Sequence, residues 1–176
     1  MPRYVALLRG INVGGNTMIN MGELRKAFES LGFKNVVSYI NSGNLAFDTR
    51  KATDAALAKR IEKAVEKNFG KSVKVMVRTQ AELGDILKNN PYDGEFEGHK
   101  EMHVLFLNAE LPKEKAVQLH ALTPEKERFT IAGREIYCHL PMGVADSFIG
   151  RGSFEKKLKI DVTARNWRTV EKLADL

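Results

Sequence analysis

The sequence predicts an α+β protein made of two ferredoxin-like halves, each an antiparallel sheet with helices on one face, the second half less regular than the first. Three observations lead to this prediction. Short apolar runs and amphipathic segments follow one another in the order βαββαβ over residues 3–78. The second half of the chain partly repeats this order. The length of 176 residues is enough for two small domains.

The first half carries start and stop signals for its elements. Residues 3–9, RYVALLR, are a nearly continuous apolar run, which predicts a buried strand. Asn20 predicts the N-cap of a helix, Glu23 stands at the capping-box position, and Gly32 predicts the end of that helix. The runs VVSYI and LAF predict two strands joined by the turn NSGN. The remaining elements are a helix around Leu57–Val65 and a strand over residues 73–78.

The chain is expected to divide into a first half over residues 1–79, a connecting helix and linker over 80–101, and a second half over 102–176. The linker is the Gly-rich, acidic stretch YDGEFEGHK. The second half begins with a strand, VLFLNA, and a helix, KEKAVQLHAL, and continues with the hairpin RFTIAGREIYCHL. An irregular stretch over residues 141–159 then precedes a last helix, which is expected to begin near Thr163.

Composition favours a soluble cytoplasmic protein. Hydrophobic residues make up 43% and charged residues 28%, as in ordinary globular proteins. No apolar run reaches the roughly 18–20 residues that span a bilayer, so no membrane partner is expected. The first residues lead directly into strand-like sequence without a cleavage-type segment, so no secretion signal is expected. The single cysteine, Cys138, excludes an internal disulfide and fits a reducing compartment.

The excess positive charge lies at the two ends of the chain. The formal net charge is +6, and residues 1–34 and residues 150–176 each contribute +3 to it. Residues 35–149 carry sixteen basic and sixteen acidic side chains, which cancel. If the two ends meet in space, this distribution favours an anionic partner. If they do not meet, it describes a weakly basic surface.

The connection between the first strand and the first helix is unusually long. Residues Gly10–Ile19 are rich in Gly and Asn, whereas connections in compact α/β units usually have about 2–6 residues. At the same point the second half has only the short stretch AELP, residues 109–112, without a glycine. The fold therefore does not require the long loop, which favours a functional explanation for it.

This loop and the turn NSGN are expected to converge. In a βαββαβ unit the first and third strands are antiparallel neighbours, so the end of the first strand lies beside the start of the third. Glycine main-chain N–H groups in such loops can form an anion-binding nest. The candidate ligand-binding residues are Arg9, Gly10, Asn12, Gly14, Gly15, Asn16, Asn41, Ser42 and Asn44, with Arg165 and Arg168 as a second layer on one face of the last helix.

The candidate residues are compatible with three functions. The first is an anion-binding module for a phosphate-bearing small molecule, such as a nucleotide, or for nucleic acid. The second is a small-molecule enzyme that uses the same site, although neither loop holds a His, Asp or Glu as an acid or base. The third is a protein-interaction module whose loops are structural turns, since Gly and Asn also serve any tight turn. This third function predicts an exposed apolar patch. The oligomeric state stays open.

Other motifs are absent or weak. The loop lacks the Lys-Ser/Thr of a P-loop and does not fit G-x-G-x-x-G. His99 and His103 are four residues apart but have no further ligand cluster, so no metal site is expected. Cys138 and His139 are adjacent in a predicted strand, where their side chains point to opposite faces. No catalytic residue and no cofactor are assigned.

The stretch YVALLRGINVGGNTMINMGELRKAFESLGFKNVVSYINSGNLAF closely resembles the opening of the bacterial domain-of-unknown-function 1697 family. KNNPYDG, GREIYCHLPMGVADS and TARNWRTVEKL resemble later blocks of that family, so the similarity covers nearly the whole chain. The resemblance implies a pair of ferredoxin-like halves. It implies no established activity and transfers no catalytic residue.

Overall fold

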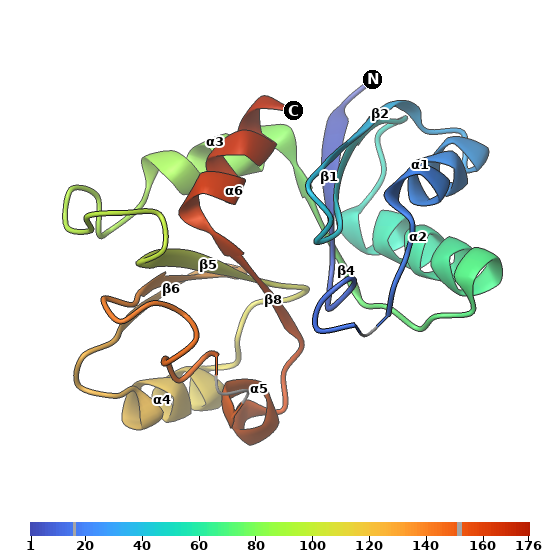
Figure 1. The fold of residues 1–176 in the computed structure, drawn as a ribbon. Coiled ribbons are helices and arrows are strands. Elements are labelled where there is room, and N and C mark those ends of the chain that lie inside the picture. The colour runs from blue at the N-terminus through green and yellow to red at the C-terminus, as the bar shows by residue number, and fades with distance from the viewer. Residues whose placement is uncertain (16, 151–152) are drawn as a thin grey trace. The chain divides into compact units, whose positions relative to one another are not determined.

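The structure is a computed structural model that describes residues 1–15, 17–150 and 153–176 (Figure 1). It divides into two compact units, one of Met1–Asp85 with Lys172–Leu176 and one of Ile86–Glu171. Each unit contains one four-stranded antiparallel sheet, which confirms the predicted α+β class. Among the described residues, no helix is long and apolar enough to cross a membrane.

The first unit has the predicted βαββαβ order. Its elements are β1 (Arg3–Leu8), α1 (Met21–Ser30), β2 (Lys34–Tyr39), β3 (Asn44–Asp48), α2 (Asp54–Phe69) and β4 (Val75–Thr79). The strands lie in the order β2-β3-β1-β4, and α1 and α2 cover one face of the sheet (Figure 1). A helix, α3 (Gln80–Lys88), follows β4.

The core of the first unit is built on one face of strands that are buried along most of their length. Every second residue of β1, beginning with Tyr4, joins the face that packs on the helices. Phe33 and Phe47 stack with ring centroids 4.2 Å apart, and Phe28 meets the Phe47 ring edge-on at 5.5 Å. The capping prediction for α1 is confirmed, since Asn20 Oδ1 accepts from the Glu23 N–H at 3.0 Å.

The two ends of the described chain are joined within the first unit. Arg3 donates from Nε and Nη2 to the Leu176 carbonyl at 3.0 and 2.9 Å. Its Nη1 also forms an ion pair with Asp48 at 2.9 Å. The hydrogen bond from Asn35 and the one from Arg3 Nη1 lower the pKa of the Asp48 carboxyl. Residues Lys172–Leu176 thus complete the first unit.

The second unit repeats the strand order of the first. Its elements are β5 (Met102–Leu107), α4 (Lys113–Leu122), β6 (Arg128–Ala132), β7 (Glu135–His139), α5 (Ser153–Leu158), β8 (Val162–Asn166) and α6 (Trp167–Asp175). The strands lie in the order β6-β7-β5-β8. Helix α5 falls in the stretch that the sequence predicted to be irregular.

The prediction of a last helix beginning near Thr163 is wrong. Val162 and Thr163 pair with Leu107 and Phe106 of β5, because β-branched residues favour a strand. The helix begins at Trp167, and Asn166 Oδ1 caps it by accepting from the Thr169 N–H at 2.9 Å. A completed fourth strand therefore gives the second sheet the topology of the first.

The segment expected to be a linker is anchored on the second sheet. The Tyr92 hydroxyl lies 2.5 Å from Thr130 Oγ1, and the Tyr92 ring lies under the Arg128 guanidinium at 4.6 Å. The Tyr137 hydroxyl donates to the Ile86 carbonyl at 2.7 Å. Residues 86–95 are thus part of the second unit.

Candidate functional site

The loop after β1 and the turn between β2 and β3 meet at one end of the first sheet. Leu8 N–H donates to the Gly43 carbonyl at 2.8 Å, and Asn12 Nδ2 donates to the Asn41 carbonyl at 2.8 Å. The predicted convergence of these two segments is confirmed. We call residues 9–15, 17–20 and 39–44 the loop–turn rim.

Asn12 organises the rim from inside. Its backbone is left-handed, with φ 54°, and its side chain binds the end of the loop and the turn between β2 and β3. Asn12 Oδ1 accepts from the Ile19 N–H at 2.7 Å, while Nδ2 donates to the Ile19 carbonyl at 3.0 Å and to Asn41. The side-chain amide of Asn12 therefore makes its hydrogen bonds within the protein. Asn12 holds the loop in place and is not a candidate to bind a ligand through its side chain.

The turn residues also have internal roles. Asn44 is fully buried, and its Nδ2 donates to the Tyr39 carbonyl at 3.1 Å and to Ser42 Oγ at 2.9 Å. Gly43 has φ 88°, and a Cβ there would lie 2.8 Å from the Leu8 Cβ and 3.0 Å from the buried Ile11. Ser42 and Asn44 thus hold the turn closed, as expected for ordinary turn chemistry.

The glycines of the loop face outward. Gly10, Gly14 and Gly15 are exposed, with φ of 69°, 58° and 76°, and no atom lies within 4 Å of where a Cβ would stand. In the described part of the chain, their main-chain N–H groups donate no hydrogen bond to the protein. Arg9 is half-buried beside them, and Asn41 is exposed. The predicted Asn16 lies outside the described residues.

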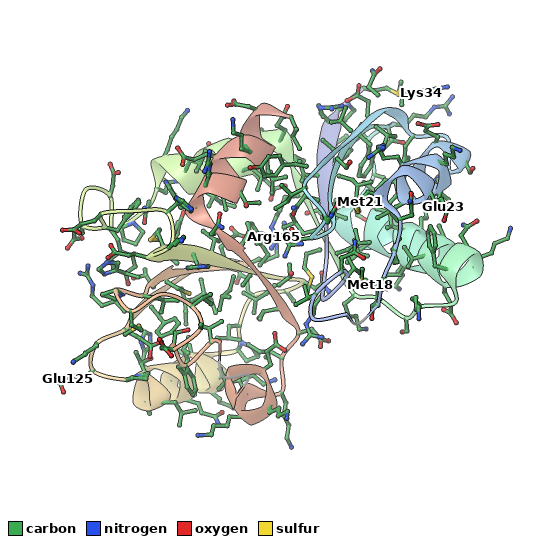
Figure 2. All side chains as sticks on the ribbon, in the orientation of Figure 1. Met18, Met21, Glu23, Lys34, Glu125 and Arg165 are labelled. Atoms are coloured by element: carbon green, nitrogen blue, oxygen red, sulfur yellow. The ribbon has the colours of Figure 1, made fainter. Side chains whose placement is uncertain are left out.

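Apolar side chains on the rim are a feature that the sequence reasoning missed. Val13 is 59% exposed, Met18 62% and Ile40 54%. Val13 follows Asn12 itself, while Met18 and Ile40 precede Ile19 and Asn41, the two residues that the Asn12 side chain binds. Figure 2 shows Met18 on the loop, with Met21 at the start of α1. The sequence signal that could have indicated these residues is the presence of apolar side chains, Val13 and Met18, in a loop otherwise rich in Gly and Asn.

Arg165 and Arg168 belong to the second unit and do not share a helical face. Arg165 lies in β8 and is 7% exposed, whereas Arg168 lies on α6 and is exposed. Arg165 Nη1 donates to Thr163 Oγ1 at 2.6 Å and to the Ala164 carbonyl at 2.9 Å. Burial lowers the pKa of Arg165 to about 10. The prediction that Arg165 and Arg168 share one face of the last helix is wrong because Arg165 precedes the helix and its guanidinium is buried.

The model of a family described as a protein of unknown function (DUF1697) matches residues 1–137, which include the loop–turn rim. The chain belongs to this family. A solved structure of a conserved bacterial protein, SP0830 from Streptococcus pneumoniae, is similar to the chain at 23% identity with a TM-score of 0.74. The similarity covers 99% of this chain and 97% of that chain, so the fold extends to β8 and α6. The comparison with curated proteins found no match.

The chemistry that this DUF1697 chain offers at the rim is hydrogen-bond donation next to apolar surface. The donors are the main-chain amides of the exposed glycines, and the exposed side chains of Val13, Met18 and Ile40 are aliphatic or thioether groups. Among the residues that the structure describes, no group of three His, Cys, Asp or Glu side chains could hold a metal ion. The rim is therefore a surface suited to recognition through amide donors and apolar contacts.

Proposed function

We propose that the first unit is a binding module for a phosphate-bearing ligand of the nucleotide class, held at the loop–turn rim. The observation that carries the proposal is that Gly10, Gly14 and Gly15 are exposed and that their main-chain N–H groups donate no hydrogen bond within the described part of the chain. Without side chains at these positions, an anionic group can approach the backbone closely.

The rim is pre-organised for such a ligand. Asn12 fixes the loop by three hydrogen bonds of 2.7–3.0 Å to residues 7 and 29 positions away. Successive main-chain N–H groups in a turn, such as those of Gly14 and Gly15, can form an anion-binding nest. Because the loop is fixed before binding, little conformational entropy is lost when an anion binds.

The apolar residues of the rim suit the other part of a nucleotide. Val13, Met18 and Ile40 expose aliphatic and thioether surface around the junction that Asn12 holds. A planar base can cover this surface and exclude water from it. A ligand with both a phosphate and an apolar group fits these observations better than free phosphate.

The test is a nuclear magnetic resonance titration of the full ¹⁵N-labelled chain with adenosine monophosphate, adenosine and inorganic phosphate. We expect the monophosphate to shift the amide signals of Gly10, Gly14 and Gly15 saturably and more strongly than either part alone. Met18→Ser is expected to weaken binding about fivefold through lost apolar contact. Val117→Ser, at a residue 67% exposed in the second unit, serves as the control. Unchanged signals over residues 10–15 would contradict the proposal.

A second candidate function is a protein-interaction module with structural loops, which the exposed Val13, Met18 and Ile40 favour. It predicts self-association or binding through these residues without a small ligand. Sedimentation equilibrium of the full chain tests self-association. An oligomer that becomes monomeric with Met18→Ser, together with no response to adenosine monophosphate, would replace the first proposal with this one.

A further inference from the structure

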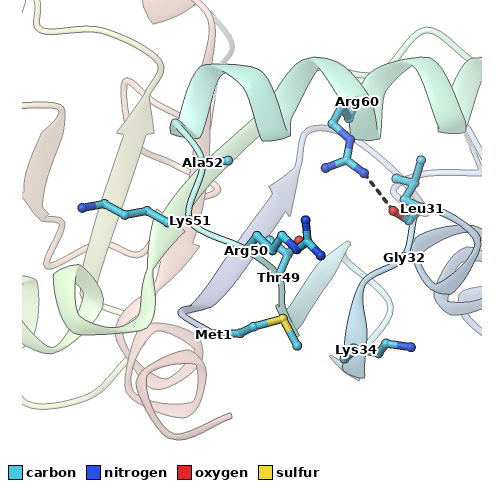
Figure 3. Close-up of a pocket in the computed structure, with 9 residues that line it drawn as sticks. All are labelled: Met1, Leu31, Gly32, Lys34, Thr49, Arg50, Lys51, Ala52 and Arg60. Atoms are coloured by element: carbon cyan, nitrogen blue, oxygen red, sulfur yellow. Dashed lines mark hydrogen bonds between the residues drawn. The ribbon is translucent and has the colours of Figure 1, made fainter.

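A second candidate site lies in the first unit, at the end of the sheet opposite the loop–turn rim. β3 starts beside the rim at Asn44 and ends at Asp48, which pairs with Arg3 at the start of β1. Beyond β3, a cavity of about 550 Å³ is lined by cationic and apolar residues (Figure 3). Its principal lining residues are Met1, Leu31, Lys34, Arg50, Lys51 and Arg60.

The cavity has a strongly positive lining. Four lining side chains are cationic, and no lining residue is acidic. In the described ranges of the chain, Lys34, Arg50 and Arg60 form no ion pair with a carboxylate. The carboxylate of Asp48, the last residue of β3, is already bound by Arg3 and Asn35. Lys34, Arg50 and Arg60 therefore bring like charges to one cavity without a carboxylate partner, and a bound anion would relieve their repulsion.

Two guanidinium groups define the cavity. Figure 3 shows the Arg50 and Arg60 side chains directed toward one another, while Lys51 points away. Arg60 is held in place, since its Nη2 donates to the Leu31 carbonyl at 2.8 Å and its Cζ lies 5.0 Å over the Phe33 ring. A guanidinium fixed in this way retains further N–H donors for a ligand.

We propose that this cavity is a binding site for a small molecule that carries a diphosphate group. Guanidinium forks match phosphate oxygens in bidentate pairs, and two guanidiniums with Lys34 match the several negative charges of a diphosphate. The volume lies within the range of small-molecule sites. Leu31 and Met1 add apolar surface for the remainder of the molecule. The proposal is independent of the function assigned to the loop–turn rim.

The test is isothermal titration calorimetry of the full chain with inorganic pyrophosphate. We expect one saturable site, weakened about tenfold by Arg50→Gln and by Lys34→Gln, because each removes one charge-assisted contact. Neither variant removes a hydrogen bond that holds the fold, so both should unfold at the wild-type temperature. Lys26→Gln, at an exposed cation of α1 outside the cavity, should bind like wild type.

Three results would overturn the proposal: no saturable heat, an equal loss of affinity in Lys26→Gln, or wild-type affinity in both Arg50→Gln and Lys34→Gln. A titration of the ¹⁵N-labelled chain with pyrophosphate separates this site from the rim. Shifts confined to residues 31–34 and 49–60 support the cavity, whereas shifts confined to residues 10–15 assign the binding to the rim. The two proposals can therefore fail independently.

Discussion

The two units share one topology but connect their first strand and first helix differently. The sheets have the orders β2-β3-β1-β4 and β6-β7-β5-β8, and each fourth strand is followed by a helix. Even the buried arginines correspond, since Arg78 pairs with Val5 and Arg165 with Val104. Each donates to the carbonyl of the preceding residue at 2.9 Å. These shared features are what the fold itself requires.

The connection is what the fold does not require. Twelve residues, Arg9–Asn20, join β1 to α1, whereas five residues, 108–112, join β5 to α4. The long connection is nevertheless ordered by Asn12 and carries exposed glycines and apolar side chains. The comparison teaches that an element kept in one copy and absent from the other is the first place to look for function.

The largest expected change in stability comes from replacing the two corresponding buried arginines. Arg78→Ala and Arg165→Ala should each lower the free energy of unfolding by roughly 4 kcal/mol, because each leaves a cavity and loses buried hydrogen bonds. Arg168→Ala, at an exposed neighbour on α6, should change it by less than about 0.5 kcal/mol. Urea unfolding measures all three. If Arg165→Ala costs no more than Arg168→Ala, the two arginines are not equivalent structural residues.

The hairpin glycines give a sharper contrast between the units. Gly43→Ala should cost about 3 kcal/mol, because the new Cβ would lie 2.8 Å from the Leu8 Cβ at a φ of 88°. Gly133→Ala, in the corresponding turn of the second unit, meets open space at a φ of 58° and should cost about 1 kcal/mol. Thermal unfolding of both variants measures the difference. Equal costs would show that the rim can adjust to the added methyl group.

A pH dependence distinguishes Tyr4 from His103, which occupy matching positions in β1 and β5. The Tyr4 hydroxyl is bonded to Ala52, whereas His103 Nδ1 is buried without a partner among the described residues. Burial lowers the pKa of His103 from 6.5 to about 4. The unfolded chain therefore takes up a proton before the folded chain does, and stability falls as pH decreases from about 6.5 toward 4.

We expect this histidine to remove about 2 kcal/mol of stability between pH 7 and pH 5. His103→Gln should lose that part of the pH dependence, as measured by urea unfolding at both pH values. Identical pH profiles for the variant and the wild type would show that His103 is protonated equally in both states.

The smallest of these effects concerns the loop. Asn12→Ala should cost about 1.5 kcal/mol, because the Ile19 N–H loses its acceptor and two carbonyls lose a donor. It should also accelerate hydrogen exchange at Ile19. Asn108→Ala, at an exposed residue after β5, should be neutral. Unchanged exchange at Ile19 in Asn12→Ala would mean that the loop is ordered by other contacts.

Much of the fold could be predicted because its signals are local. The α1 cap depends on Asn20 and Glu23, three residues apart, and the strands of the first sheet alternate or run apolar. β8 was missed because its five residues adjoin the cap of α6, and a helical spacing of charges concealed the strand pattern.

The site was harder to predict because its partners are distant in sequence. The convergence of the loop and the turn follows from topology, and the structure confirms it. That Asn12 points inward depends on the carbonyls of Ile19 and Asn41, which no local pattern specifies. The burial of Arg165 likewise depends on strand pairing, since a charged residue is usually exposed.

The hydrogen bonds from Arg3 to the Leu176 carbonyl have a consequence for biosynthesis. Arg3 of β1 is synthesised 173 positions before Leu176, to which it is bonded, because residues 172–176 belong to the first unit. The nascent N-terminal sheet therefore leaves the exit tunnel without its final contacts. It acquires them only after the intervening module has been synthesised and the chain has returned.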